Sequence, residues 1–223
     1  MNPGFTFLKN RGFTSDTIKT FLLTYYDGNK LYGHSEVLEE GVTQKVARML
    51  QNLKMHEDTK DKFTHSVIFP ITDLYSRPVA IFARMLEGKP KFNATVFGKQ
   101  NLLYGLDASS EHVLSKDHIY ITEGIFDFLM LWQYGIRNAA CALGTNIAYP
   151  QMCLSFRFTS NINLVFDPDN AGRVGAVKAR KRIVRGGGTC NNIVLDEHCD
   201  LDDYIVKYGI QRFLRHAKNF KQV

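Results

Sequence analysis

The stretch HIYITEGIFDFLMLWQYG, residues 118–135, carries two acidic side chains in an otherwise apolar segment. Residues 118–122 predict a buried β-strand, and the dense apolar residues at 125–134 predict a core-facing helix. Glu123 then lies at the strand-to-helix junction, and Asp127 follows one turn later on the same face of the helix. A helix N-terminus favours acids, which explains Glu123 better than Asp127. Alternatively, the two carboxylates belong to a functional site, since buried charges need a partner or a metal.

Composition restricts the class of protein. The 223 residues suffice for one large domain or two small ones, and 44% hydrophobic residues indicate a globular chain. A net charge of +6, from 28 basic and 22 acidic residues, suits an anionic partner. No apolar run approaches the roughly 20 residues that span a bilayer, so nucleic acid is favoured over a membrane.

Targeting signals and cysteines point to the same compartment. The first residues, MNPGFTFLKNRGF, lack the basic start and apolar stretch of a signal peptide. The four cysteines include no closely spaced pair, so we expect reduced thiols and no zinc site; they are Cys141, Cys153, Cys190 and Cys199. We expect a cytoplasmic protein.

From residue 118 onward, strands and helices alternate four times, which predicts an α/β fold with a parallel four-stranded sheet. The expected strands are 118–122, 139–143, 162–167 and 191–195. The expected helices are 125–134, 148–157, 171–185 and 201–207, with a last amphipathic segment at 210–220.

The first half of the chain is less regular and predicts an α+β subdomain. Residues 5–23 predict two short helices, the second capped by Thr14 or Ser15. Residues 42–53 predict another helix, and the segment 56–62 a linker. Residues 66–86 predict two strands around a turn that contains Asp73 and Pro78.

Acidic residues follow three of the predicted parallel strands. The third strand ends in NLVFDPDNAGRVGA, which places Asp167 at its end and Asp169 in a turn. The fourth is followed by DEHCDLDDYI, which adds Asp200, Asp202 and Asp203. DPDNAG alone could be an ordinary turn. Because the carboxyl ends of parallel strands meet at one edge of the sheet, however, we expect all three acidic groups to converge there.

Converging carboxylates repel one another unless a cation lies among them. Ligation by oxygen alone favours magnesium or manganese. Two such ions about 4 Å apart would suit phosphoryl transfer.

These acidic motifs resemble the Toprim domain shared by DnaG-type primases, topoisomerases and some nucleases. Four further segments resemble the DnaG primase catalytic core in the same order: 7–14, 66–86, 90–106 and 134–146. The resemblance implies an N-terminal α+β subdomain at 1–116, a Toprim domain at 117–209 and a C-terminal helical segment at 210–223.

The resemblance also implies roles for individual residues. Glu123 would be the general base or proton acceptor, and Asp127 would support the site. The ligands of two or more Mg²⁺ or Mn²⁺ ions would be Asp167, Asp169, Asp200 and Asp202, while Asp203 would cap a helix. Arg84, Lys91 and Lys99 would lie in a cleft and bind phosphates of template and nucleotide.

The activity implied is that of a primase, which makes short RNA primers on single-stranded DNA from nucleoside triphosphates. We expect the chain to lack the family's zinc-binding and helicase-binding domains, as in a phage-like protein, and to work with a replicative helicase and a separate zinc-bearing template-recognition protein. A Toprim-type metal-dependent nuclease and a non-catalytic nucleic-acid-binding replication subunit are the alternatives. The basic segment 171–185 is either a solvated helix face or a contact for nucleic acid or a partner.

Overall fold

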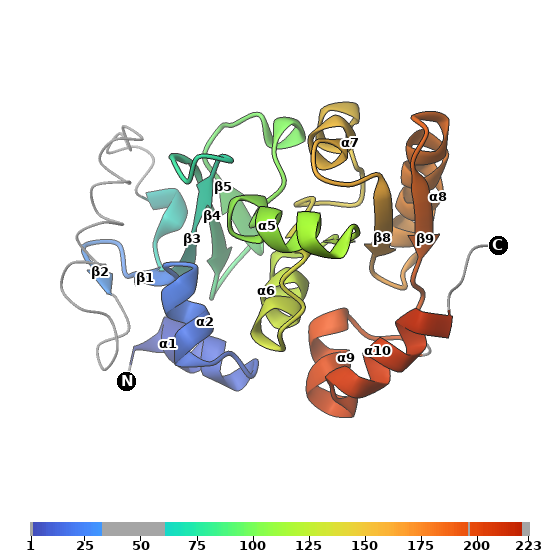
Figure 1. Ribbon diagram of the computed structural model, residues 1–223. Coiled ribbons are helices and arrows are strands. Elements are labelled where there is room, and N and C mark those ends of the chain that lie inside the picture. Colours follow the sequence, from blue (N-terminus) through green and yellow to red (C-terminus); the bar gives the residue numbers. More distant parts are fainter. Residues whose placement is uncertain (1, 33–60, 196, 220–223) are drawn as a thin grey trace. The chain divides into compact units, whose positions relative to one another are not determined.

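The computed structural model describes residues 2–32, 61–195 and 197–219. The chain divides into two units, Met1–Phe97 and Gly98–Val223, whose elements are labelled in Figure 1. The helix predicted at 42–53 and most of the linker predicted at 56–62 lie outside the described residues. Segment 98–116 packs with the second unit, whereas the domain boundary expected after residue 116 stays a prediction.

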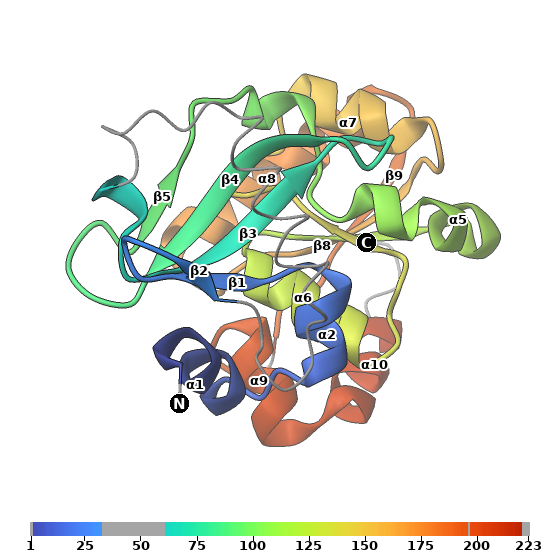
Figure 2. The ribbon, with the colours of Figure 1, turned by 90° about the vertical axis from the view of Figure 1, so that its left-hand side faces the viewer.

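The first unit is built on an antiparallel sheet with the strand order β2-β1-β3-β4-β5 (Figure 2). The strands are β1 (Thr24–Tyr26), β2 (Leu31–Tyr32), β3 (Ser66–Thr72), β4 (Pro78–Met85) and β5 (Phe92–Ala94). The short helix η1 (Asp61–Phe63) leads into β3. Ile68, Ile81 and Phe63 pack together in the core of this unit.

The two strands predicted at 66–86 are confirmed, and the turn between them forms around Asp73. One oxygen of Asp73 accepts hydrogen bonds from the backbone N–H groups of Tyr75 (2.9 Å) and Arg77 (3.0 Å). The Arg77 guanidinium pairs with its other oxygen. The Asp73 carboxylate thus satisfies the turn's backbone donors, as turn-forming acids do.

The two short N-terminal helices are confirmed as α1 (Pro3–Asn10) and α2 (Ser15–Thr20). Asn2 caps α1 by accepting from Gly4 N–H at 2.9 Å. Thr14 caps α2 by accepting from Thr17 N–H at 3.4 Å. Of the two caps considered for this helix, the structure therefore selects Thr14.

The second unit contains the predicted parallel sheet, with the strand order β7-β6-β8-β9. Its strands are β6 (Ile119–Thr122), β7 (Ala139–Cys141), β8 (Asn161–Val165) and β9 (Thr189–Asn192). Its helices are α5 (Leu106–Lys116), α6 (Ile125–Gln133), α7 (Tyr149–Phe156), α8 (Asn170–Arg185), α9 (Leu201–Tyr208) and α10 (Ile210–Asn219), with the short helix η2 (Lys99–Asn101). The α/β fold class is confirmed.

The last strand begins earlier than predicted. Apolar residues favoured a strand at 191–195, but β9 pairs with β8 from Thr189 to Asn192. Polar side chains connect the two strands: Thr189 donates to Asn161 at 2.8 Å, and Asn191 donates to Asn163 at 2.9 Å. Such cross-strand pairs stabilise an edge strand without an apolar pattern. Ile193 is buried beyond the end of β9.

Helix α5 was not predicted, and its packing explains how it is fixed. Gly105 precedes it with φ +78°, and a Cβ there would lie 2.1 Å from the Phe128 ring. Glycine alone meets both requirements.

All four cysteines are free. In the described part of the chain, no helix has the length and apolar character to span a bilayer.

Candidate active site

Glu123 and Asp167 lie next to each other at the carboxyl edge of the parallel sheet. Glu123 follows β6, and Asp167 comes two residues after β8. Because β6 and β8 are adjacent and parallel, with Thr122 opposite Val165, both acids follow their strands at the same edge of the sheet. The charge of Asp167 raises the pKa of Glu123, so the two carboxylates lie near each other. The predicted convergence of these two acidic groups is therefore present.

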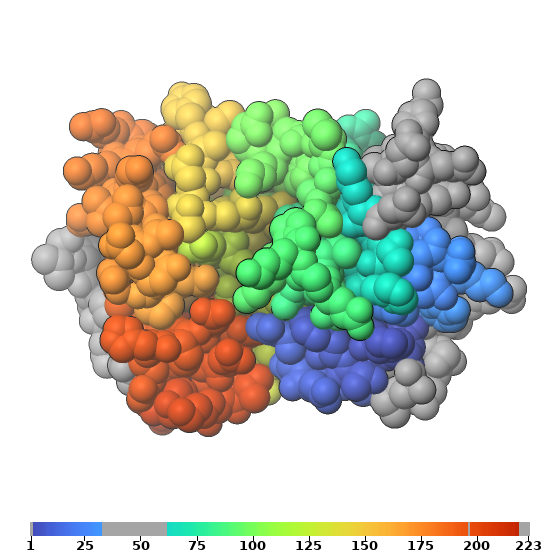
Figure 3. Space-filling view, turned by 180° about the vertical axis from the view of Figure 1, so that it is seen from behind, coloured from blue at the N-terminus to red at the C-terminus, as the bar shows by residue number. Residues whose placement is uncertain are grey.

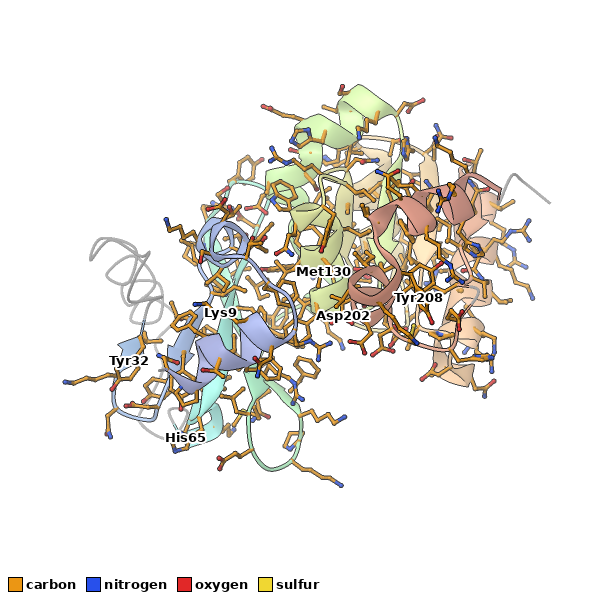
Figure 4. All side chains as sticks on the ribbon, turned by 90° about the horizontal axis from the view of Figure 1, so that it is seen from below. Lys9, Tyr32, His65, Met130, Asp202 and Tyr208 are labelled. Atoms are coloured by element: carbon orange, nitrogen blue, oxygen red, sulfur yellow. The ribbon has the colours of Figure 1, made fainter. Side chains whose placement is uncertain are left out.

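Asp127 joins helices α6 and α9. It lies in the first turn of α6 with a side chain only 5% exposed. Its Oδ1 accepts a hydrogen bond from the backbone N–H of Asp202 at 3.1 Å. Asp202, which is labelled on α9 in Figure 4, is buried as well. Asp127 thus satisfies a backbone donor at the start of α9, from 75 residues away in sequence.

The cap predicted for α9 was wrong. Asp200, not Asp203, stands at the N-cap position, and its side chain makes no capping hydrogen bond. Asp203 is an exposed residue of the first turn. Because Asp127 satisfies the N–H of Asp202, the Asp200 carboxylate is not required to cap the helix.

Asp169 caps helix α8. Its Oδ1 accepts from the backbone N–H of Gly172 at 2.7 Å, which makes it the N-cap of α8. A Cβ at Gly172 would stand 2.2 Å from the Asp167 carbonyl oxygen, so glycine permits α8 to begin directly against the acidic turn. The interpretation of DPDNAG as an ordinary turn is therefore correct for Asp169. Asp167 lies instead beside Glu123 in the candidate active site.

Burial and mutual repulsion change the ionisation of the acids. Burial, followed by the charge of Asp167, raises the pKa of Glu123 to about 7. Burial and then the charges of Asp200 and Asp169 raise the pKa of Asp167 to about 6. Burial, with the charge of Asp202, raises the pKa of Asp127 well above its usual range. Ionisation of each of these carboxyl groups is therefore unfavourable in the folded protein, and a bound cation would stabilise the ionised forms.

The donors fit a hard divalent cation, because all of them are carboxylate oxygens. Glu123 Oε2 is buried and has no hydrogen-bond partner among the residues that the structure describes, so it is available to bind a cation. Within residues 2–32, 61–195 and 197–219, no three acidic, imidazole or thiol side chains stand close enough together to share one ion. A Mg²⁺ ion held here would be bound by one or two carboxylates, with water or substrate phosphate oxygens as its other ligands.

Lys99 lies near this acidic edge within the same unit. Its ammonium is 3.8 Å from where a Cβ on Gly144 would stand, and Gly144 N–H donates to the Glu123 carbonyl at 3.1 Å. Lys99 and Gly144 both line a cavity of about 320 Å³ beyond the end of β7. The structure thus places Lys99 and this cavity near the backbone of Glu123.

Gln151 holds the segment that carries Lys99. Its side-chain amide donates to the carbonyls of Lys99 (3.1 Å), Leu102 (2.9 Å) and Ala142 (3.1 Å). Its oxygen accepts from Ala148 N–H at 2.9 Å, and the residue is 1% exposed. Sequence reasoning missed this residue, because its partners come from distant segments.

The other two predicted basic residues lie together in the first unit. Arg84 Nη1 donates to the carbonyls of Met85 (2.8 Å) and Lys91 (3.1 Å), and the Lys91 side chain is exposed. The Arg84 guanidinium lies 5.6 Å from the Phe7 ring and 5.3 Å from the Phe92 ring. This arrangement fixes the guanidinium by cation–π contacts.

Arg11 is a further cation of this group that sequence reasoning missed. Its guanidinium lies 5.9 Å from the Phe7 ring, the same ring that Arg84 contacts. Burial, and then the positive charge of Arg11, lower the pKa of Arg84. The spacing of Phe7 and Arg11, one helical turn apart, was the available signal. Arg11, Arg84 and Lys91 form one basic group in this unit.

A parallel four-stranded sheet with carboxylates beyond its carboxyl edge defines the second unit as a Toprim-type domain. Residues 120–205 match the family model described as Toprim-like, and residues 2–110 match the one described as DNA primase catalytic core, N-terminal domain. The chain belongs to the family of DnaG-type DNA primase catalytic cores.

Individual relatives agree with this assignment. The chain is 28% identical to the DNA primase of Staphylococcus aureus (strain COL) over 97% of its own length and 38% of the relative's. A solved DNA primase domain from Pseudomonas aeruginosa matches 97% of this chain and 71% of that one, with 29% identity and a TM-score of 0.78. The Aquifex aeolicus primase, solved with its zinc-binding and RNA polymerase domains, matches 98% and 56%, with 25% identity and a TM-score of 0.80.

Proposed function

We propose that the chain is a primase core that synthesises short RNA primers on single-stranded DNA from nucleoside triphosphates. The observation that carries the proposal is the pair of acids Glu123 and Asp167 at the carboxyl edge of the Toprim sheet, where the charge of Asp167 helps to raise the pKa of Glu123. An acid with its pKa near neutrality suits proton transfer. The chain spans 38% of the length of the relative from Staphylococcus aureus, so activity, substrates and partners all belong to this proposal.

Glu123 is the proposed proton acceptor for the primer's 3′ hydroxyl. With a pKa of about 7, its carboxylate is partly ionised at neutral pH and can both accept and release a proton. Asp127 is the proposed positioning residue, since it anchors the N-terminus of α9 and with it Asp202.

Asp167, Asp169, Asp200 and Asp202 are the proposed ligands of divalent cations. Proteins of the Toprim and primase families generally use such ions, and Mg²⁺ or Mn²⁺ fits a donor set of oxygens. When bound, two such ions would neutralise the charge that develops on the phosphate during nucleotidyl transfer. The carboxylates of this chain would hold them and would lose their mutual repulsion in doing so.

The basic residues are the proposed phosphate contacts. Lys99 would attract the triphosphate at the cavity beside Gly144, where Gln151 fixes its backbone. Arg84 and Lys91 would bind the backbone of the template strand, to which cations contribute affinity without sequence specificity. A replicative helicase and a zinc-bearing template-recognition protein are proposed as partners on the basis of the family alone.

The test is a primer-synthesis assay with mixed-sequence single-stranded DNA, labelled ribonucleotides and magnesium or manganese. Wild type should make short labelled RNA. Glu123→Gln should reduce synthesis by at least about a hundredfold, as loss of a general base does, while Asp203→Asn, an exposed acid of the same region, should stay active. Wild-type activity in Glu123→Gln would overturn the assignment of the site. DNA degradation without nucleotides would identify a nuclease instead.

A further inference from the structure

A second surface of the Toprim unit is a groove between α7 and α8, which we call the α7–α8 groove. Figure 3 shows these helices, gold and orange, on one face of that unit. The groove has a volume of about 590 Å³. Met152 and Phe156 of α7 form an apolar floor, and a Cβ on Gly186 would lie 3.0 and 3.2 Å from their side chains. None of the proposed catalytic residues lines it.

All the cations of the α7–α8 groove come from one wall. Lys178, Lys181 and Arg185 lie on α8, whereas the facing helix α7 has no basic residue. Among the described residues, no carboxylate pairs with any of these three side chains. The fourth cation, Arg182, donates to the backbone carbonyl of Ile147 and so is held within the unit. The groove therefore offers unneutralised positive charge beside an apolar floor.

Helix α8 also exposes apolar side chains next to these cations. Val177 and Val184 are 52% and 51% exposed, and they lie two turns apart on the helix with Lys181 between them. These valines add exposed apolar area beside the cations, and apolar area rimmed by polar residues is typical of interaction sites. The combination of charge and apolar area indicates a ligand with both properties.

We propose that the α7–α8 groove binds an acidic peptide segment of a partner protein, with one large apolar side chain of that segment over Met152 and Phe156. Aspartates or glutamates of the segment would face Lys178, Lys181 and Arg185, and its apolar flank would cover the valines of α8. Complementary charge of this kind sets the partner and the rate of association. The buried apolar anchor would supply most of the affinity.

The geometry favours a peptide over nucleic acid. A single strand needs cations that follow its backbone and exposed aromatic rings on which bases stack. Here the cations occupy one wall, the floor contains a buried methionine, Met152, and a partly buried ring, Phe156, and the single exposed ring among the lining residues, Tyr149 at 64%, does not form the row of rings on which successive bases stack. A ligand with one acidic side and one apolar side matches these two walls, whereas a uniformly anionic backbone matches only one.

The test uses a fluorescein-labelled peptide of aspartates with one central phenylalanine, titrated with the full chain and followed by anisotropy. The peptide should bind wild type. The double variant Lys181→Glu and Arg185→Glu should weaken binding by about tenfold or more, since each reversal turns an attraction into a repulsion. Replacing the peptide's phenylalanine by alanine should also weaken binding.

Two controls make the result specific. Lys116→Glu, a charge reversal at an exposed residue of α5 in the same unit, should leave peptide binding unchanged. The double variant should keep primer synthesis at the wild-type level, since neither residue belongs to the candidate active site. Equal loss of binding in Lys116→Glu would overturn the proposal. If wild type does not bind the peptide, the proposal is also wrong. It is wrong as well if an oligothymidylate of equal charge binds more tightly than the peptide and the double variant abolishes that binding.

Discussion

Replacing Asp167 by asparagine should stabilise the metal-free protein while it destroys the proposed activity. The pKa of Asp167 is raised from 3.8 to about 6 by burial and by neighbouring acids. Each pKa unit corresponds to about 1.4 kcal/mol, so the ionised carboxylate would cost about 3 kcal/mol if it were fully shielded. Because Asp167 is partly exposed, solvent screening reduces the expected gain in the free energy of unfolding to about 1–2 kcal/mol.

The gain depends on pH with a definite sign. Below the unfolded-state pKa of 3.8 the carboxyl is protonated in both states, so wild type carries no penalty. Between 3.8 and about 6 the unfolded chain ionises while the folded one keeps its proton, and wild type loses stability as pH rises. Above about 6 the penalty is complete. The asparagine side chain of the variant does not titrate, so the stability difference should grow from near zero at about pH 3.5 to its full value at about pH 7.5.

Urea denaturation of both proteins in a chelator, at about pH 3.5 and pH 7.5, measures this difference. Magnesium should then stabilise wild type more than Asp167→Asn, since a ligand stabilises the state that binds it. Asp203→Asn is the control, and its free energy of unfolding should change by no more than about 0.5 kcal/mol. If Asp167→Asn is less stable than wild type at the higher pH, or if the difference is the same at both pH values, the repulsion argument is wrong.

Two further substitutions test the scaffold of the site. Gly175→Ala places a Cβ 2.0 Å from the Thr145 carbonyl oxygen and should lower the free energy of unfolding by about 1–3 kcal/mol. Thermal melting measures this loss, with Val174→Ala at an exposed site as the control. Equal melting temperatures of the two variants would show that the close contact at Gly175 is not present. Asp127→Asn keeps an oxygen that can accept a hydrogen bond from Asp202 N–H. In a chelator at about pH 7.5, this variant should therefore unfold at the same urea concentration as wild type or at a higher one. Asp127→Ala removes the acceptor and should lower the free energy of unfolding by about 1 kcal/mol, as the loss of a helix cap does.

Much of the Toprim unit was predictable because its strands are short apolar runs that are each followed by a helix. Parallel topology then fixes where Glu123 and Asp167 meet, without knowledge of any side-chain conformation. The strand β9 escaped this reasoning, because its ladder uses Thr189 and Asn191, whose side chains bond across to β8. The apolar pattern at 191–195 predicted a strand around Ile193, but this buried residue follows the end of β9.

Contacts between segments far apart in sequence were not predictable. Gln151 binds three carbonyls of two separate segments, and any of several polar residues would fit its place in the pattern of α7. Arg11 joins Arg84 only through the Phe7 ring that lies between them. In each case the residue type was visible in the sequence, but its partner was set by tertiary packing.

The acids of the candidate site divide into those that also hold helices and those that do not. Asp127 accepts from a backbone N–H of α9 and Asp169 from one of α8, so each has a structural role that asparagine can also fill. Glu123 has a buried oxygen that finds no hydrogen-bond partner in the described part of the chain, and burial together with repulsion raises its pKa to about 7. An unfavourable charge with a strongly raised pKa, held in place by the fold without a capping role, agrees with the proton-accepting role proposed for Glu123.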